Sequence, residues 1–215
     1  MSRRIDRAAR RREIVEAHLR LIAREGMQAA TTRALTAELG VARGALWHYF
    51  SSFDELLSET FQLVFERTNA RIEARVADHA GVAGLLAMLD EILPGGKTTH
   101  DEAFVVVSFW GRVPSNPELA VRQADVVDSW RRGMLARTAA AAAAGELRSE
   151  SPQAEIVDTL LVLGTGGQIE HVLGTPQGDG ARLRRLAAQM LEPWLTESGR
   201  AAAAEFGPAS AAGQG

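Results

Sequence analysis

The stretch from Thr31 to Phe50 reads TTRALTAELGVARGALWHYF, and it predicts two short helices joined by a tight turn. The first helix is expected at about residues 32–39, where a threonine at its start can cap free backbone N–H groups. Gly40 then supplies the left-handed backbone conformation that a sharp turn requires. With a second helix at about residues 42–50, this pattern is typical of a helix-turn-helix, whose second helix enters the major groove of DNA.

The apolar positions of this stretch are spaced so that the two helices pack on each other. They are Leu35, Leu39, Val41 and Leu46. The other positions of the second helix are left to face outward. They are Arg43, Gly44, Ala45, Trp47, His48 and Tyr49.

One helix is predicted before this motif and another directly after it. Residues 10–25 carry apolar side chains at helical spacing and end at a glycine, and His18 lies on that apolar face as an expected core histidine. Ser52 and Glu55 form a capping box, so a new helix starts there and runs to about residue 77. The sequence thus predicts a three-helix N-terminal domain, residues 1–52.

The rest of the chain is predicted to be helical, which gives an all-α protein of about nine helices. The further helices are expected at about residues 82–93, 101–113, 117–144, 152–173 and 181–195. The β-branched residues 105–107 would also suit a strand, but no partner strand is evident, so a buried helix is predicted. A body domain is expected over residues 53–197, followed by an Ala/Gly/Ser-rich disordered tail, residues 198–215.

Charge is divided unevenly along the 215 residues. Residues 1–50 hold ten arginines and five acids, a balance of +5, whereas the remainder holds 14 basic and 22 acidic residues, a balance of −8. Six arginines fall within residues 1–12, which predicts a mobile basic arm that leads into the first helix. This arm could contact DNA phosphates or be a solvated, disordered terminus. The neighbouring helix-turn-helix favours phosphate contact.

The composition limits the kinds of site and the cellular compartment that this protein can have. Hydrophobic residues make up 46% of the chain, which is enough for a sizeable core, and cysteine is absent, so neither disulfides nor thiolate metal sites are available. No signal peptide is evident, and no apolar run approaches the ~20 residues that span a membrane. A cytoplasmic protein without a membrane partner is expected.

Taken together, these residues resemble the TetR family of transcriptional regulators. The resemblance is nearly continuous from Ile14 to Leu57, through IVEAHLRLIAREG, the helix-turn-helix and SSFDELL. SFWGRVPSNPELA and the AAGEL helix end are similar to the BetI-type subgroup. The resemblance implies a homodimer, most simply a repressor, that binds a palindromic operator and responds to a small-molecule effector.

The family's DNA contacts fall on matching positions here. They are Thr31, Thr32, Arg33, Ala42, Arg43, Gly44, Ala45, Trp47, His48 and Tyr49. Among them, Arg43 is best suited to read guanine because a guanidinium can donate to both O6 and N7. The family usually has Tyr where this chain has Trp47, and Lys where it has Phe53, so two phosphate contacts are weakened or lost.

The resemblance also implies a ligand cavity and a dimer interface in the body. The predicted ligand-binding residues are Phe61, Phe65, Met88, Phe104, Trp110, Trp130, Met134, Gln168 and His171. The predicted dimer-interface residues are Leu160, Leu163, Gly164, Gly167, Leu183, Leu186, Met190 and Trp194. For both sets, burial as ordinary core of one subunit is the open alternative, and likeness to BetI does not establish choline as the ligand.

No catalytic or metal-binding constellation is evident, and no cofactor is expected. The five histidines are scattered, and HExxH, GxSxG and glycine-rich phosphate loops are absent from the sequence. An enzyme is therefore not predicted. The competing hypothesis to a ligand-responsive repressor is a DNA-binding activator or architectural protein that has no small-molecule effector.

Overall fold

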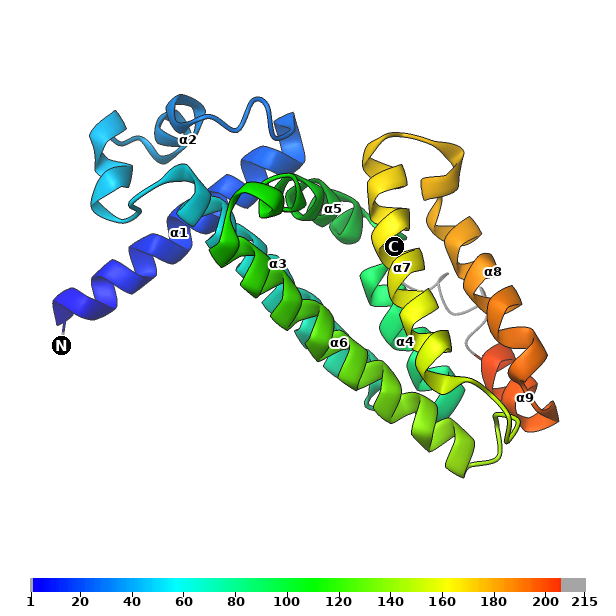
Figure 1. Cartoon of the computed structure of the whole chain (residues 1–215). Coiled ribbons are helices and arrows are strands. Elements are labelled where there is room, and N and C mark those ends of the chain that lie inside the picture. Colours follow the sequence, from blue (N-terminus) through cyan, green and yellow to red (C-terminus); the bar gives the residue numbers. More distant parts are fainter. Residues whose placement is uncertain (1, 206–215) are drawn as a thin grey trace. The chain divides into compact units, whose positions relative to one another are not determined.

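The computed structural model describes residues 2–205 and the side chains of residues 7–204. Within these residues the chain folds into nine α-helices and four short 3-10 helices, which confirms the all-α prediction (Figure 1). The described residues form two compact units. Unit 1 takes the chain up to Arg67 together with His100–Gln123, and unit 2 takes Thr68–Thr99 together with the chain from Ala124 onward.

Unit 1 is built from the N-terminal helices and the segment that packs on them. Its elements are α1 (Ser2–Glu25), α2 (Thr32–Leu39), η1 (Arg43–His48), the first part of α3 (Phe53–Val76), most of α5 (Lys97–Trp110), η2 (Val113–Ser115) and the start of α6 (Pro117–Ala143). Large apolar side chains from α1, α2, η1 and α3 are fully buried. Phe61 of α3 stacks on Phe109 of α5, with ring centroids 3.9 Å apart.

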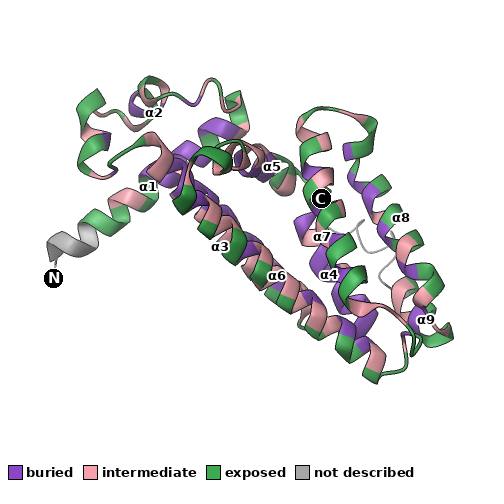
Figure 2. Ribbon diagram, in the orientation of Figure 1, coloured by how far each residue is buried: buried purple, intermediate pink, exposed green. Residues whose placement is uncertain are grey.

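Unit 2 is a second helical core. Its elements are the ends of α3 and α6, α4 (Gly81–Ile92), α7 (Gln153–Val172), η3 (Pro176–Gly178), α8 (Gly180–Leu191), η4 (Glu192–Trp194) and α9 (Glu197–Glu205). Buried residues of α4, α6, α7 and α8 form one apolar cluster. The Glu146 carboxylate accepts from the Val82 N–H at 2.7 Å, so it caps the start of α4. Figure 2 marks the buried positions along these helices.

Apart from the second helix of the motif, the predicted helices are confirmed in type, with shifted ends. Residues 105–107 lie inside α5, so the helical interpretation of that β-branched run is right. The last predicted helix, residues 181–195, contains Pro193 near its end, where a kink or a stop was expected. The α-helix α8 ends at Leu191 and the short turn η4 follows, because proline cannot donate a helical hydrogen bond. Within the described residues, every helix is too short or too polar to cross a membrane.

Both predicted ends of the chain need correction. Helix α1 begins at Ser2, so the segment predicted as a mobile arm is helical. At the other end, residues 197–205 form α9 where a disordered tail was predicted from residue 198. The Thr196 and Ser198 hydroxyls both donate to the Gly145 carbonyl, at 2.7 and 3.0 Å, and this fixes the start of α9. Residues 206–215 of the predicted tail lie outside the described part.

The division into units also differs from the predicted boundary between residues 52 and 53. That point lies inside unit 1, directly before α3. The first part of α3 packs with α1 and with α5 through side chains such as Phe61, so it belongs to the N-terminal core. A capping signal locates the start of a helix but does not reveal which core that helix joins.

Candidate nucleic-acid interface

The first helix of the predicted motif has the expected boundaries and caps. Helix α2 spans Thr32–Leu39, and the Thr31 hydroxyl accepts from the Ala34 N–H at 3.2 Å. Gly40 has φ 64°, the left-handed conformation predicted for the turn. Leu35 is fully buried, so α2 is fixed on the core of unit 1 by its inner face.

The second helix of the motif is shorter and tighter than predicted. Residues 42–50 were expected to be helical, whereas η1 is a 3-10 helix over Arg43–His48. Its first turn is closed by the Ala45 N–H donating to the Ala42 carbonyl at 2.8 Å. Leu46 points inward and is buried, so the remaining side chains of η1 are turned away from the core.

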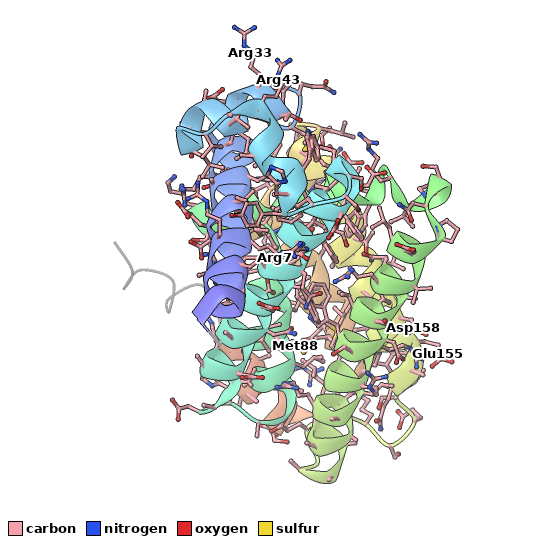
Figure 3. All side chains as sticks on the ribbon, turned by 90° about the vertical axis from the view of Figure 1, so that its left-hand side faces the viewer. Arg7, Arg33, Arg43, Met88, Glu155 and Asp158 are labelled. Atoms are coloured by element: carbon pink, nitrogen blue, oxygen red, sulfur yellow. The ribbon has the colours of Figure 1, made fainter. Side chains whose placement is uncertain are left out.

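All ten predicted DNA-binding residues lie on the turn before α2, on α2 itself, or on η1 and its flanks. Seven of them are exposed, and Thr32, Ala45 and Tyr49 are half-buried. Exposed positions follow one another along η1 (Figure 2). Trp47 is 43% exposed despite its large apolar ring. Arg33 and Arg43 project outward at the same end of unit 1, as Figure 3 shows.

Two arginines of α1 hold the far end of η1. Arg7 Nη2 donates to the His48 carbonyl at 3.2 Å, and Arg11 Nη1 donates to the Tyr49 carbonyl. Phosphate contact was predicted for this arginine-rich segment, but these two side chains are engaged with backbone oxygens of the same unit. The signal that could have revealed them is their spacing of four residues, which places both on one face of a helix.

Arg11 also meets two carboxylates of α3. Its Nη2 donates to Glu55 Oε1 at 2.8 Å and to Glu59 Oε1. Although burial acts to lower it, the hydrogen bonds to Glu59 and Glu55 raise the pKa of Arg11. The same bond with Arg11, helped by the Ser51 N–H and hydroxyl, lowers the pKa of Glu55 to about 2. Arg11 and Glu55 therefore both stay charged at neutral pH.

The capping box is formed with a small shift. The Ser52 hydroxyl accepts from the Glu55 N–H at 3.0 Å, as predicted. The Glu55 carboxylate reaches back to the Ser51 N–H at 2.6 Å and the Ser51 hydroxyl at 2.7 Å. The rings of Phe53 and His18 lie edge to face with their centroids 5.3 Å apart, so Phe53 packs on the core histidine of α1.

The nine predicted ligand-binding residues are divided between the two units. Phe61, Phe65, Phe104 and Trp110 lie in unit 1, and Met88, Trp130, Met134, Gln168 and His171 lie in unit 2. Polar groups of this set are already engaged, since Trp110 Nε1 donates to Gln123 and Trp130 Nε1 donates to Asn69. Gln168 donates to the Ile92 carbonyl at 2.9 Å, while its buried Oε1 has no partner among the described residues.

Half of the predicted dimer-interface residues are buried within a single chain. Leu160, Gly164, Gly167 and Leu183 are covered by unit 2 itself, so the core alternative holds for them. A Cβ at Gly167 would lie 2.5 Å from Leu183 Cδ1, which shows that this glycine lets α7 and α8 approach closely. Leu163, Met190 and Trp194 are half-buried, and Leu186 is exposed.

Other apolar side chains of α7 are exposed and were not predicted. Val162 is 72% exposed and Leu173 is 68% exposed, with Ile169 between them. Spacings of seven and four residues place the three on one face of the helix. The predicted leucine, methionine and tryptophan residues were chosen for their apolar character, and that criterion also selects the core.

Two family models match this chain. The model for bacterial regulatory proteins of the tetR family matches residues 14–60, and the model for the C-terminal region of BetI-type transcriptional repressors matches residues 82–196. The HTH-type transcriptional regulator PksA of Bacillus subtilis is 29% identical over 202 residues, which cover 93% of this chain and 97% of PksA. The HTH-type transcriptional repressor Rv1474c of Mycobacterium tuberculosis is 38% identical over 79 residues. These residues cover 37% of this chain and 40% of Rv1474c.

Solved structures share the fold. A transcriptional regulator from Saccharomonospora viridis, in complex with choline, gives a TM-score of 0.78 at 22% identity and covers 86% of this chain and 96% of its own. A TetR transcription regulator from Haloarcula marismortui gives a TM-score of 0.76 at 19% identity. The match covers 88% of this chain and 100% of the regulator. At this level of identity the likeness concerns architecture alone.

Proposed function

Because this chain belongs to the TetR family of DNA-binding transcriptional regulators, we propose that it is a repressor that binds a palindromic operator as a homodimer and is released by a small molecule. The observation that carries the proposal is the exposed surface of α2 and η1, where the ten predicted contact residues gather. As a regulator of this family, the chain is not an enzyme.

The DNA contacts are divided between positioning and base reading. Thr31, Thr32 and Arg33 lie at the start of α2, where free backbone N–H groups and the helix dipole favour a phosphate. Arg43 opens η1 and reads a guanine through O6 and N7, while Ala45 contacts a thymine methyl group. Trp47 contributes an indole N–H to the backbone of the DNA.

The exposed stripe of α7, defined as Val162, Ile169 and Leu173, supports the homodimer. An apolar face of this kind on a helix is costly in water and is suited to a second copy of the same face across a two-fold axis. Leu186 on α8 is exposed as well and extends the apolar area. Two such subunits place two copies of η1 in one assembly, which matches a palindromic operator.

Release follows from linkage between ligand and DNA. A ligand that prefers the conformation in which the two η1 helices no longer fit the half-sites lowers the affinity for DNA, and DNA lowers the affinity for the ligand by the same factor. The regulator from S. viridis was solved with choline, so choline is a natural first probe.

One feature of unit 2 disfavours a cation. Arg137 is half-buried, its Nη1 donates to the Gly133 carbonyl of its own helix at 2.9 Å, and its buried Nε has no partner among the described residues. A Cβ at Gly133 would lie 3.3 Å from Met88 Cε and 3.7 Å from Arg137 Nη1, so this guanidinium is beside a predicted ligand residue. An alkyl carboxylate such as octanoate is therefore the matched second probe.

The deciding experiment is a binding selection on randomised duplex DNA with the purified protein. We expect an enriched palindrome, bound more tightly than random DNA, with an affinity that falls between about 50 and 200 mM salt. Titration of choline and of octanoate into the complex then tests release. No enrichment in the absence or presence of these probes would contradict the operator proposal, and release by neither would favour a regulator without a small-molecule effector.

A further inference from the structure

The short helix η1 has little internal support for its orientation. It has six residues, and 3-10 hydrogen bonds are weaker than those of an α-helix. The carbonyls at the end of any helix lack donors from the helix itself. The direction in which η1 presents Arg43 and Ala45 thus depends on what holds its final turn.

Helix α1 supplies those donors. Arg7 donates to the His48 carbonyl at 3.2 Å, and Arg11 donates to the next carbonyl, that of Tyr49. The guanidinium carbon of Arg11 also lies 4.4 Å from the centroid of the Phe50 ring, which is buried. Two successive carbonyls and the following ring are therefore held by one face of α1.

The same guanidinium is joined to α3. Its Nη2 donates to Glu55 and Glu59, and Glu55 in turn accepts from the N–H and the hydroxyl of Ser51, which lies between η1 and α3. One side chain thereby connects α1, the end of η1 and the first turns of α3. Charge-assisted hydrogen bonds of this kind are stronger and more directional than neutral ones.

We propose that Arg11, assisted by Arg7, is a positioning residue for operator recognition: it fixes the orientation of η1 against α1 and α3 without contacting DNA. This rests on the proposed function. The Arg11 side chain is 24% exposed, with Nη1 engaged by a carbonyl and Nη2 by two carboxylates. Both terminal nitrogens of Arg11 are thus already engaged within unit 1, and its charge is already compensated by carboxylates.

The neighbouring Arg12 offers a matched contrast. Its side chain is 62% exposed, and its Nε lies 3.4 Å from Glu16 Oε1, one turn further along the same helix. A phosphate contact contributes equally to all DNA sequences and to the salt dependence, whereas a positioning residue affects only the complex in which η1 must fit the base edges. The two roles are therefore separable by the ratio of specific to random binding.

The test compares Arg11→Gln and Arg12→Gln with the unchanged protein, on the selected operator and on random DNA at two salt concentrations. Arg11→Gln is expected to weaken operator binding about tenfold, as for loss of one charged hydrogen bond, with random binding and the salt slope unchanged. Arg12→Gln is expected to weaken both alike or neither. Equal loss on operator and random DNA for Arg11→Gln, or no loss, would overturn the proposal.

Two further measurements separate positioning from folding. Amide hydrogen exchange of Tyr49 and Phe50 should quicken in Arg11→Gln, while exchange in α2 stays as in the unchanged protein. If Arg11→Gln does not fold, Arg7→Gln and Glu59→Gln replace it, since each removes one contact of the cluster, and an unchanged specificity ratio in both would overturn the proposal. If the unchanged protein selects no operator, the proposed function itself fails, which is a distinct result.

Discussion

His18 and Thr60 share a hydrogen bond inside unit 1, with the ring Nδ1 2.9 Å from the threonine Oγ1. Thr60 gives its own hydroxyl hydrogen to the Leu56 carbonyl at 2.8 Å, so the ring donates from Nδ1 and keeps Nε2 as an acceptor. That Nε2 is buried and has no partner among the described residues. A proton there would be a buried charge, and burial accordingly lowers the pKa of His18 to about 4.

This histidine should make unit 1 sensitive to mild acid. The pKa in the folded chain is lower than the ordinary 6.5, so the unfolded chain binds the proton first, and stability falls as pH drops from about 6.5 towards 4. The loss levels off below pH 4 and amounts to about 3 kcal/mol. Urea unfolding at pH 7, 6 and 5 measures it, with His18→Gln as the control. Parallel pH profiles for the two proteins would contradict this assignment.

Arg43 and Arg33 should respond differently to removal. Arg43→Ala should relax the base preference at one position of each half-site, at a cost of about 1–3 kcal/mol on the operator. Arg33→Ala should weaken binding to all sequences alike. The slope of log affinity against log salt concentration should fall by about one for each phosphate contact that is lost. Repeating the selection with each variant measures both. A loss that is equal on operator and random DNA for Arg43→Ala would show that it contacts phosphate instead.

Local signals in the sequence located the motif well. The ends of α2, a threonine cap at Thr31 or Thr32 and the left-handed Gly40 were all predicted, because each depends only on residues next to it in the chain; the structure selects Thr31 as the cap. The packed core role of His18 was also predicted and is confirmed, since its position on an apolar helix face is a local pattern. These features needed no knowledge of distant contacts.

Roles that depend on distant partners could not be predicted in the same way. Arg11 is one arginine among six in its segment, and only the fold brings it to Tyr49 and Glu59. Likewise, Gly167 was predicted as a dimer-interface residue, whereas its close neighbour Leu183 belongs to the same chain. Periodicity identifies an apolar face but does not distinguish the core from an interface.

The Ala/Gly/Ser-rich composition after residue 197 predicted disorder where helix α9 forms. A substitution at Gly199 tests how α9 is packed. A Cβ at Gly199 would lie 2.0 Å from the Glu146 carbonyl oxygen, a backbone atom that cannot move aside cheaply. Gly199→Ala should therefore lower the free energy of unfolding by about 1–3 kcal/mol, although alanine is the better helix former. The exposed Ala201→Gln serves as control and should change it by less than about 0.5 kcal/mol. Equal stability of Gly199→Ala and the unchanged protein would mean that α9 is not packed as described.

The exposed stripe of α7 makes a prediction about assembly. Val162→Lys places a charge on the most exposed residue of the apolar face and should convert a dimer into a monomer, because an unpaired charge buried in an interface is costly. Operator affinity should fall with the dimer, since one subunit reaches only one half-site. Val121→Lys is the matched control: this valine is 64% exposed but lies on α6 in unit 1 and is not part of the stripe. Light scattering after size exclusion gives the mass of each protein, and a Val162→Lys variant that remains dimeric would place the interface elsewhere.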